Sequence, residues 1–256
     1  MTARGVETLK SVSLILCEDT RHSRRLLDHF GIGTRTSSLH EHNEARETPK
    51  LVARLVAGED LALISDAGTP LLSDPGARLV QAAIAAGMTV SPVPGASALL
   101  SALVGAGLDA ESFTFLGFLP RKGKERTNQL TFLSTLSHTA VLYEAPNRVG
   151  DTLNEIAALV DEGRRAVVAR ELSKHYEEFR RGTVRELAEY YLGTSPRGEV
   201  VIIVEGRGPV TIDEAALGEQ ARALRARGAT TREIARVLVE RHGASRNLAY
   251  RLAQDA

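Results

Sequence analysis

Asp-Leu-Ala-Leu-Ile-Ser-Asp-Ala-Gly-Thr-Pro-Leu-Leu-Ser-Asp-Pro-Gly, residues 60–76, is the stretch of sequence that decides the fold. Its apolar run, Leu61 to Ile64, predicts a strand that is buried on both faces, as in a parallel sheet. A turn rich in Asp, Gly and Pro follows, and Asp74-Pro75-Gly76 then predicts the start of an amphipathic helix. Because open α/β sheets bind ligands at the carboxyl ends of their strands, this loop is predicted to bind a ligand.

Outward from this stretch, short apolar runs alternate with segments of helical periodicity. The alternation predicts an α/β fold with mostly parallel sheets. The predicted helices cover residues 20–30, 47–57, 74–86, 96–106, 126–136, 148–162 and 184–192. The predicted strands are Val12–Cys17, Thr36–Leu39, Leu61–Ile64, Thr89–Pro92, Phe113–Leu116, Ala140–Tyr143, Ala166–Ala169 and Val200–Val204.

The strands are too many for one small domain, and Pro-Gly at 94–95 offers a break between two. We expect an N-terminal α/β domain over residues 1–93 and a C-terminal α/β domain over 94–207. Residues 213–256 contain helical patterns only, which predicts a small helix-turn-helix-like tail. Between residues 220 and 253, eight Arg and two Glu leave an excess of six positive charges. An RNA- or DNA-binding appendage and a solvated helical cap both fit this pattern.

Composition sets limits on the class of protein. The chain has 256 residues, with 32 basic and 32 acidic side chains, so its formal net charge is zero and does not attract a polyanion. A nucleic acid would therefore have to bind to local patches of basic residues. The single cysteine, Cys17, excludes an internal disulfide. No signal-peptide pattern and no apolar run of membrane-spanning length is present in the sequence, so we expect a cytoplasmic protein without a membrane partner.

Two further polar motifs follow predicted strands. In Glu-Asp-Thr-Arg-His, residues 18–22, the acids suit the start of a helix, whereas Arg21 and His22 do not, and a substrate anion would explain them. His-Glu-His-Asn-Glu, residues 40–44, contains metal-binding side chain types but no distant third ligand accompanies them. We therefore expect no metal, and a polar loop that positions a ribose or phosphate.

The remaining loops also look suited to binding. Val-Pro-Gly-Ala-Ser, residues 93–97, ends a strand and opens a helix, and its glycine permits close approach of a ligand to the backbone. The segment 117–126 is basic, with four cations in six residues, which suits phosphate contacts. No Walker loop and no nucleophile with an adjacent base occur in the sequence. The pattern favours binding loops that orient two reactants over covalent catalysis.

Eight of these motifs, in order, resemble those of the rRNA-methylating members of the tetrapyrrole (corrin/porphyrin) methylase superfamily. The resemblance extends over nearly the whole chain. It implies two α/β domains with S-adenosyl-L-methionine between them and a homodimer. It also implies 2′-O-methylation of the ribose of cytidine 1402 in 16S rRNA of the small ribosomal subunit. The motifs cover residues 18–22, 40–44, 65–70, 74–76, 94–95, 117–120, 169–174 and 198–199.

Site residues follow from the resemblance and from their chemistry. The cofactor loops would be formed by Asp66, Ala67, Gly68, Thr69, Pro70, Pro94, Gly95 and Ser97, with Tyr143 from the second domain. The candidates for the base that takes the ribose proton are Glu18, Glu44, Glu171 and Glu199. The residues expected to contact RNA are Arg21, His22, His40, His42, Arg121, Lys122, Lys124, Arg148, Lys174, Arg236, Arg246 and Arg251.

One departure from the family concerns the N-terminus. Family members begin with a strand and a Pro-Ile-Gly-Asn loop beside the cofactor, whereas residues 2–4 here join the family pattern within the helix that follows. We therefore expect that this interior strand is missing and that its neighbours are left with unpaired backbone groups. Two alternative functions stay open: a tetrapyrrole C-methyltransferase on the same fold, and an inactive RNA-binding remnant.

Overall fold

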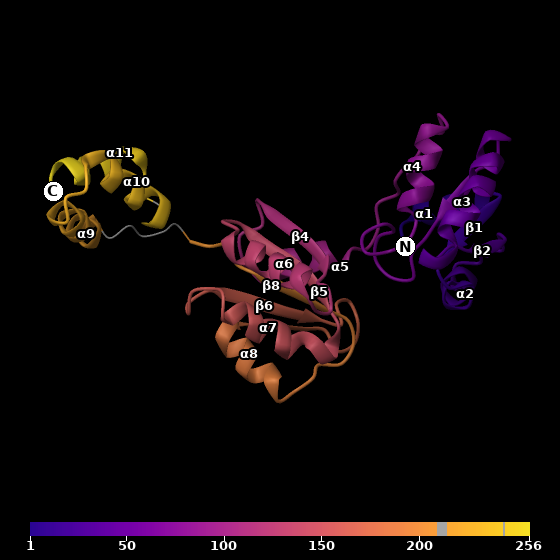
Figure 1. Cartoon of the computed structure of the whole chain (residues 1–256). Helices are drawn as coiled ribbons and strands as arrows, with labels where there is room; N and C mark the ends of the chain where they lie inside the picture. The colour runs from indigo at the N-terminus through magenta and orange to yellow at the C-terminus, as the bar shows by residue number, and fades with distance from the viewer. Residues whose placement is uncertain (209–213, 243) are drawn as a thin grey trace. The chain divides into compact units, whose positions relative to one another are not determined.

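The computed structural model describes residues 1–208, 214–242 and 244–256, without the side chains of 240–242 (Figure 1). The chain divides into two compact units, Met1–Gly206 and Arg207–Ala256. The first unit contains two separate sheets, and the boundary expected between them near residue 93 stays a prediction. The expected start of the tail, residue 213, lies outside the described residues.

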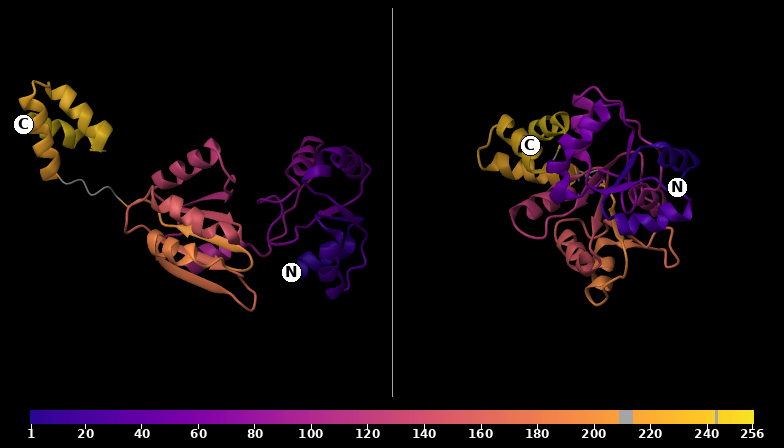
Figure 2. Two further views of the ribbon diagram at one scale, coloured as in Figure 1. Left: turned by 60° about the horizontal axis from the view of Figure 1, so that its bottom comes forward. Right: turned by 90° about the vertical axis from the view of Figure 1, so that its right-hand side faces the viewer.

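The first sheet has the order β2-β1-β3, and both pairings are parallel. Every residue of the central strand β1 is buried. Its Leu14 and Leu16 pack in one apolar cluster and Ile15 in another, so helices cover both faces of the strand, as the apolar runs predict (Figure 2). The strands are β1 (Leu14–Cys17), β2 (Thr36–Ser38) and β3 (Leu61–Leu63), and the helices of this region are α1 (Ala3–Ser11), α2 (Thr20–His29), α3 (Glu41–Val56) and α4 (Ala77–Ala85).

One edge of this sheet is open. Beyond β3 no further strand is paired within the described residues, and all three residues of β3 are only half-buried. The strand predicted at Thr89–Pro92 does not form. A strand persists only where a neighbour satisfies its backbone groups, and residues 89–92 have no such neighbour. The expectation that the family's first strand is missing beside these strands stays a prediction.

The second sheet has the order β4-β5-β8-β6-β7. Helix α5 covers one face of the sheet, and helices α6, α7 and α8 cover the other (Figure 2). Each face has one apolar cluster. Its strands are β4 (Phe113–Phe118), β5 (Thr139–Glu144), β6 (Arg165–Arg170), β7 (Glu178–Thr183) and β8 (Val200–Val204). The helices are α5 (Ala98–Ala106), α6 (Lys124–Thr135), η1 (Pro146–Arg148), α7 (Val149–Ala157) and α8 (Val184–Leu192).

The parallel arrangement expected for this sheet holds only for β4 and β5. The pairs β5–β8, β8–β6 and β6–β7 are antiparallel. β7 follows β6 through a loop without a helix, so it runs back alongside β6. Helix α8 connects β7 to β8, and β8 runs in the same direction as β7. β8 lies between β5 and β6 and is antiparallel to both. β7 was not predicted from the sequence, because Glu-Phe-Arg-Arg-Gly-Thr lacks an apolar run.

The second unit is a cluster of three helices within the described residues, α9 (Glu214–Ala226), α10 (Thr231–His242) and α11 (Arg246–Gln254). Leu217, Ile234 and Leu238 are among the buried residues that form its core. Arg225 donates hydrogen bonds to the Ala229 carbonyl oxygen at 3.2 Å and to Thr231 Oγ1 at 2.9 Å, so this arginine stabilises the unit itself. Over the described stretches of the chain, every helix is too short or too polar to span a bilayer.

Candidate functional site

Three carboxylates gather where β1 and β3 end. Glu18 follows β1, and Asp66 and Asp74 belong to the loop after β3. Burial raises the pKa of Asp74 from 3.8 to about 6, and the negative charges of Glu18 and Asp66 add to the rise, while a hydrogen bond with Ser65 opposes it. The carboxyl ends of these strands therefore carry a group of acidic side chains, one of which has a pKa raised to about 6.

The loop that follows β3 has an unusual backbone. Gly68 and Gly76 have φ angles of +73° and +121°, and Leu71 and Ser73 also lie in the left-handed region, at 73° and 67°. Each of the two non-glycine residues costs about 1–3 kcal/mol in that conformation. A Cβ at Gly76 would overlap the Cδ2 atom of Leu63, so the Leu63 side chain would have to shift to admit one. The loop is held in a strained, specific shape.

Glu44 fixes the end of this loop. Its Oε1 accepts hydrogen bonds from the backbone N–H groups of Gly76, Arg78 and Leu79, at 3.1, 2.8 and 3.2 Å. These donors would otherwise be unsatisfied at the N-terminus of α4. The helix begins at Ala77, not at Asp74 as predicted, because the N-cap Gly76 has a φ of +121°, outside the helical region. Glu44 therefore has a capping role.

The loop predicted at residues 40–44 is instead the start of a helix. His40 is the N-cap of α3, and Asn43 Oδ1 accepts its backbone N–H at 2.9 Å. Asn43 Nδ2 donates to the Ser38 carbonyl oxygen at 3.1 Å. Helical periodicity had suggested a start near residue 47, close to Pro49, but these caps extend α3 back to Glu41. The acids of this motif lie in the first turn, where they suit the helix dipole.

A second glycine loop lies against the first. Thr69 Oγ1 donates a hydrogen bond to the Ala96 carbonyl oxygen at 3.1 Å. Ser97 is the N-cap of α5, and its side chain accepts the Leu100 N–H at 3.3 Å. No described atom lies within 4 Å of a Cβ placed at Gly68 or Gly95, so both glycines face open space. The structure thus joins the two predicted cofactor loops and leaves their backbones accessible.

Tyr143 lies at the end of β5, with its ring among aromatic neighbours. Its ring centroid is 4.9 Å from that of Phe115 and 5.5 Å from that of Phe118. Burial raises the pKa of its phenol, although a hydrogen bond from the backbone of Leu99 opposes the rise, and the charge of Asp74 adds to it. Leu99 belongs to α5, which starts at the second glycine loop, so Tyr143 is near that loop.

Two of the other candidate bases form a cluster with Lys174. Lys174 Nζ lies 2.9 Å from Glu171 Oε1 and 3.2 Å from Glu199 Oε2. Its hydrogen bond lowers the pKa of Glu171, and the same bond raises that of the lysine. Glu171 Oε1 also accepts the Glu199 N–H at 3.1 Å. These groups hold two loops together, whereas the exposed Glu18 forms no hydrogen bond or ion pair with a described residue.

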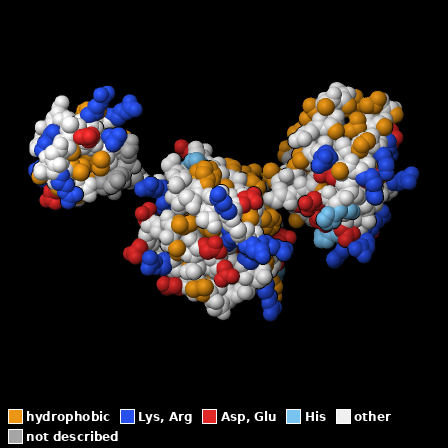
Figure 3. Space-filling model, in the orientation of Figure 1, with side chains coloured by type: hydrophobic (Ala, Val, Ile, Leu, Met, Phe, Trp, Pro, Cys, Tyr) orange, Lys and Arg blue, Asp and Glu red, His pale blue; other side chains and the backbone are white. Residues whose placement is uncertain are grey.

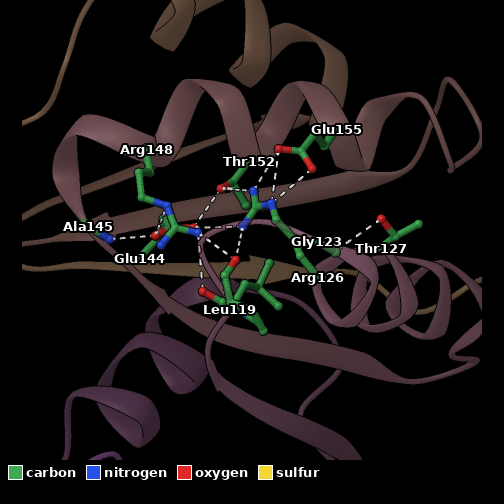
Figure 4. Close-up of polar contacts among 10 residues, drawn as sticks. Leu119, Gly123, Arg126, Thr127, Glu144, Ala145, Arg148, Thr152 and Glu155 are labelled. Carbon is green, nitrogen blue, oxygen red and sulfur yellow. Dashed lines mark hydrogen bonds and ion pairs between the residues drawn. The ribbon is translucent and has the colours of Figure 1, made fainter.

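A buried polar network supports the basic loop (Figure 4). Glu144 Oε2 accepts from Thr152 Oγ1 at 2.6 Å, and Glu144 Oε1 accepts from the Ala145 N–H at 2.8 Å. Arg148 Nε lies 3.4 Å from Glu144 Oε1, and the same guanidinium donates to the Leu119 and Pro120 carbonyl oxygens. Arg148, predicted to contact RNA, is therefore engaged with the protein itself.

Arg126 completes this network. It donates to Thr152 Oγ1 at 2.9 Å, to the carboxylate of Glu155 at 2.9 Å, and to the Pro120 carbonyl oxygen at 3.1 Å. Both arginines therefore converge on the backbone of the Gly-Phe-Leu-Pro segment and fix the start of the loop that carries Arg121, Lys122 and Lys124. Those three cations are exposed, and none forms an ion pair with a described residue.

The other residues predicted to contact RNA are mostly exposed. Arg21 pairs with Asp19 at 3.2 Å, and the rings of His40 and His42 are 6.0 Å apart. Figure 3 shows histidine side chains next to acidic ones on the N-terminal part of the chain, with lysine and arginine side chains close by. Among the described residues, no group of three or more potential metal ligands occurs. His22 in the first unit is exposed, as are Arg236, Arg246 and Arg251 in the second.

Sequence reasoning missed the distinct character of Asp74 and the Arg126–Glu144 network. Asp74 lies in the opening stretch, but nothing in the order of residues reveals its burial or its two acidic neighbours. Glu144 stands at the end of an apolar strand, which is a recognisable signal of a buried, paired carboxylate. Its partner Arg126 was interpreted as part of a basic surface segment.

Comparisons with known proteins agree with this geometry. The family model for tetrapyrrole (corrin/porphyrin) methylases matches residues 1–188. The ribosomal RNA small subunit methyltransferase I of Synechocystis is 42% identical over 100% of this chain and 92% of its own length. The protein of the same name from Escherichia coli O157:H7 is 40% identical over 100% of this chain and 90% of its own length.

Solved structures share the fold at low identity. A diphthine synthase structure has a TM-score of 0.63 at 15% identity, covering 80% of this chain and 84% of its own. A uroporphyrin-III C-methyltransferase from Thermus thermophilus, complexed with S-adenosylhomocysteine, has a TM-score of 0.56 at 18% identity, covering 80% and 90%. The predicted resemblance and the predicted α/β fold class are thereby confirmed. The chain belongs to the tetrapyrrole (corrin/porphyrin) methylase family, together with the relatives named ribosomal RNA small subunit methyltransferase I.

Proposed function

We propose that this protein transfers a methyl group from S-adenosyl-L-methionine to the ribose 2′-oxygen of cytidine 1402 in 16S rRNA. The observation that carries the proposal is identity of 42% sustained along 100% of the chain with a relative named for small-subunit rRNA methylation. The tetrapyrrole-modifying structures are 18% identical and cover 80% of the chain. Its place of action would be the cytoplasm, and a homodimer is part of the proposal.

The described residues fit the cofactor. S-adenosyl-L-methionine supplies an electrophilic methyl group on a positively charged sulfur. Asp66 and the neighbouring Asp74 and Glu18 provide negative charge at the strand ends, which favours a cationic ligand. Gly68 and Gly95 leave backbone groups open to a ligand. We expect residues 66–70, 94–97 and Tyr143 to hold the cofactor.

Orientation is the main contribution of the site to catalysis. A strained loop capped by Glu44, and a basic loop fixed by Arg126 and Arg148, would hold two reactants in a set geometry, which can supply much of the rate acceleration. Arg121, Lys122 and Lys124 are the cations best placed for RNA phosphates, because no described partner engages them.

We favour Asp74 as the base that takes the ribose proton. A general base works best with a pKa near the operating pH, and the pKa of Asp74 is about 6. Glu44 is engaged in a helix cap, and Glu171 and Glu199 are paired with Lys174. Glu18, which is exposed, is the remaining candidate. Asp74→Asn should lower kcat strongly and Glu18→Gln only weakly.

The test is transfer of labelled methyl from S-adenosyl-L-methionine to small ribosomal subunits that lack the modification. Nuclease digestion and mass spectrometry should then find 2′-O-methylcytidine at the expected position. Label on a base or on another nucleotide would contradict the proposal. Uroporphyrinogen III, offered in parallel, tests tetrapyrrole C-methylation, and RNA binding without any transfer would identify an RNA-binding remnant.

Cofactor binding has its own test. Gly68→Val should abolish binding of S-adenosyl-L-methionine in calorimetry while leaving RNA affinity nearly unchanged, because the added side chain fills the space that the glycine leaves open. Gly87→Val, at an open glycine with a similar left-handed φ of +77°, is the matched control. Unchanged cofactor affinity of Gly68→Val would refute the role of this loop.

A further inference from the structure

A pocket lies between two loops of the C-terminal sheet, outside the residues assigned to the cofactor. Its volume is about 480 Å³, within the range of about 300–1,000 Å³ typical of small-molecule sites. It is lined mainly by the loop after β6 and by the end of α8 with the loop that follows. Its lining includes Arg170, Tyr176, Glu178, Tyr190, Tyr191 and Arg197.

The walls of this pocket are fixed. The Glu171 N–H donates to the Glu199 carbonyl oxygen at 3.0 Å, and the Glu199 N–H donates back to Glu171 Oε1 at 3.1 Å. Gly198 lies directly beneath the Glu171 side chain, where a Cβ would overlap the carboxylate. Lys174 bridges both carboxylates. The two loops therefore hold their spacing without a ligand.

Two aromatic rings are presented at the pocket. Tyr176 is 69% exposed and Tyr190 is 45% exposed. The guanidinium of Arg180 lies 3.8 Å from the centroid of the Tyr190 ring and holds it from one side. The adjacent Tyr191 is buried, which raises the pKa of its phenol, so it belongs to the wall. Exposed, oriented tyrosines are the surfaces on which nucleobases stack.

The charged residues that line the pocket are two arginines, Arg170 and Arg197, and two glutamates, Glu171 and Glu178, so the lining has no net charge. Glu178 pairs with Arg170 at 2.6 Å and with Arg180 at 2.9 Å, and Glu171 pairs with Lys174. The acids are thus neutralised within the wall. Arg197 is exposed and pairs with none of the described residues, so it is available for an anion. Aromatic rings beside an unpaired arginine suit a nucleotide, with its base on a ring and its phosphate on the guanidinium.

We propose that this pocket binds one unpaired nucleotide of a single-stranded RNA segment, with its base stacked on Tyr190 and Tyr176 and its phosphate at Arg197. The proposal rests on the proposed function, since it names a subsite for the RNA substrate. The alternative occupant is a protein partner, which would bring apolar or acidic side chains to the same surface. Sedimentation of the tyrosine variants distinguishes a protein interface from an RNA site.

The first measurement is binding of a fluorescein-labelled, short single-stranded RNA oligonucleotide to the full chain. Tyr190→Ala and Tyr176→Ala should each weaken binding by about 5- to 150-fold, the loss expected for one base–aromatic stack of about 1–3 kcal/mol. Tyr190→Phe, which keeps the ring, should bind like the wild type. Phe132→Ala removes a ring that is 50% exposed on α6 and is the matched control. Duplex RNA of the same sequence should not distinguish the variants.

The second measurement locates the RNA directly. Cross-linking of the same oligonucleotide carrying 4-thiouridine should label peptides that contain Tyr176 or Tyr190. Wild-type affinity of both alanine variants, or cross-links only elsewhere, would overturn the proposal. If those variants instead change the sedimentation of the protein, the surface is a protein interface. RNA binding does not depend on methyl transfer, so the two proposals can fail separately. If the alanine variants lose RNA affinity but the wild type transfers no methyl group, only the proposed function is refuted. If the wild type transfers the methyl group and Tyr190→Ala has an unchanged KM for RNA, only the pocket is refuted.

Discussion

Replacement of Glu144 by Gln tests whether the buried polar network stabilises the C-terminal sheet. The Glu144 side chain is 0% exposed, and its two oxygens receive the Ala145 N–H at 2.8 Å and the Thr152 hydroxyl at 2.6 Å. Glutamine keeps one oxygen as a hydrogen-bond acceptor, but its NH₂ group replaces the other. That NH₂ group would face another donor, either the Thr152 hydroxyl or the Ala145 N–H and Arg148, and could not accept a hydrogen bond from it. One charged hydrogen bond is lost, worth about 1.5–3 kcal/mol, and Arg148 loses its carboxylate partner.

The expected destabilisation is about 3 kcal/mol, at the lower end of the range for breaking a buried ion pair. It stays at that end because Arg126 keeps Glu155 at 2.9 Å and the Pro120 carbonyl oxygen at 3.1 Å. Glu155→Gln is the control: the Glu155 side chain is 45% exposed, and its loss should cost less than about 1 kcal/mol.

Urea unfolding followed by far-UV circular dichroism measures both free energies, and the m-values should not change. Hydrogen exchange of peptides from β5 assigns the transition to the first unit. In thermal unfolding, Glu144→Gln should lower Tm by roughly 6–12 °C. A difference between the two variants below about 1 kcal/mol would refute the reasoning, since the network would then contribute no more than a surface pair.

Three further predictions concern the loop after β3. Gly76→Ala should destabilise the protein by about 2–5 kcal/mol in urea unfolding, because a left-handed φ and an overlap with Leu63 combine. The control Gly58→Ala also has a left-handed φ but lies in open space, so it should cost only about 1 kcal/mol. Equal costs for the two variants would exclude the packing argument. Glu44→Ala should cost about 1–2 kcal/mol by removing a helix cap, and unchanged stability would refute that role. The raised pKa of Asp74, about 6, favours its protonated form in the folded state, so its stabilising contribution is complete below about pH 4 and is lost as pH rises through about 6. The shift sets an upper limit of about 3 kcal/mol, which solvent screening reduces to about 1 kcal/mol, and Asp74→Asn should remove that pH dependence from urea unfolding measured across this range.

The sequence predicted local elements well where a single apolar run or a single cap decided them. β1 and α8 lie where their patterns placed them, and Ser97 and Thr183 cap helices as their residue types indicate. The fold class and the family were also accessible, because many short motifs keep their order along the chain.

Features that depend on distant neighbours could not be predicted. Residues 89–92 have the composition of a strand but no strand to pair with, and the polar β7 forms because the edge of β6 is available. Glu44 belongs to a polar motif, yet its role is set by three backbone groups more than thirty residues away. The pKa of Asp74 depends on burial and on Glu18 and Asp66, which only the fold brings near.

The placement of β8 has a consequence for synthesis on the ribosome. β5 and β6 are each hydrogen-bonded to β8, and β8 follows both of them in the chain. During synthesis from the N-terminus, the centre of the C-terminal sheet therefore remains empty until residue 204 has emerged, although both flanking strands and their helices are already available. Until then the backbone N–H and C=O groups on the facing edges of β5 and β6 lack their β8 partners, so the last strand made is the one that closes the sheet.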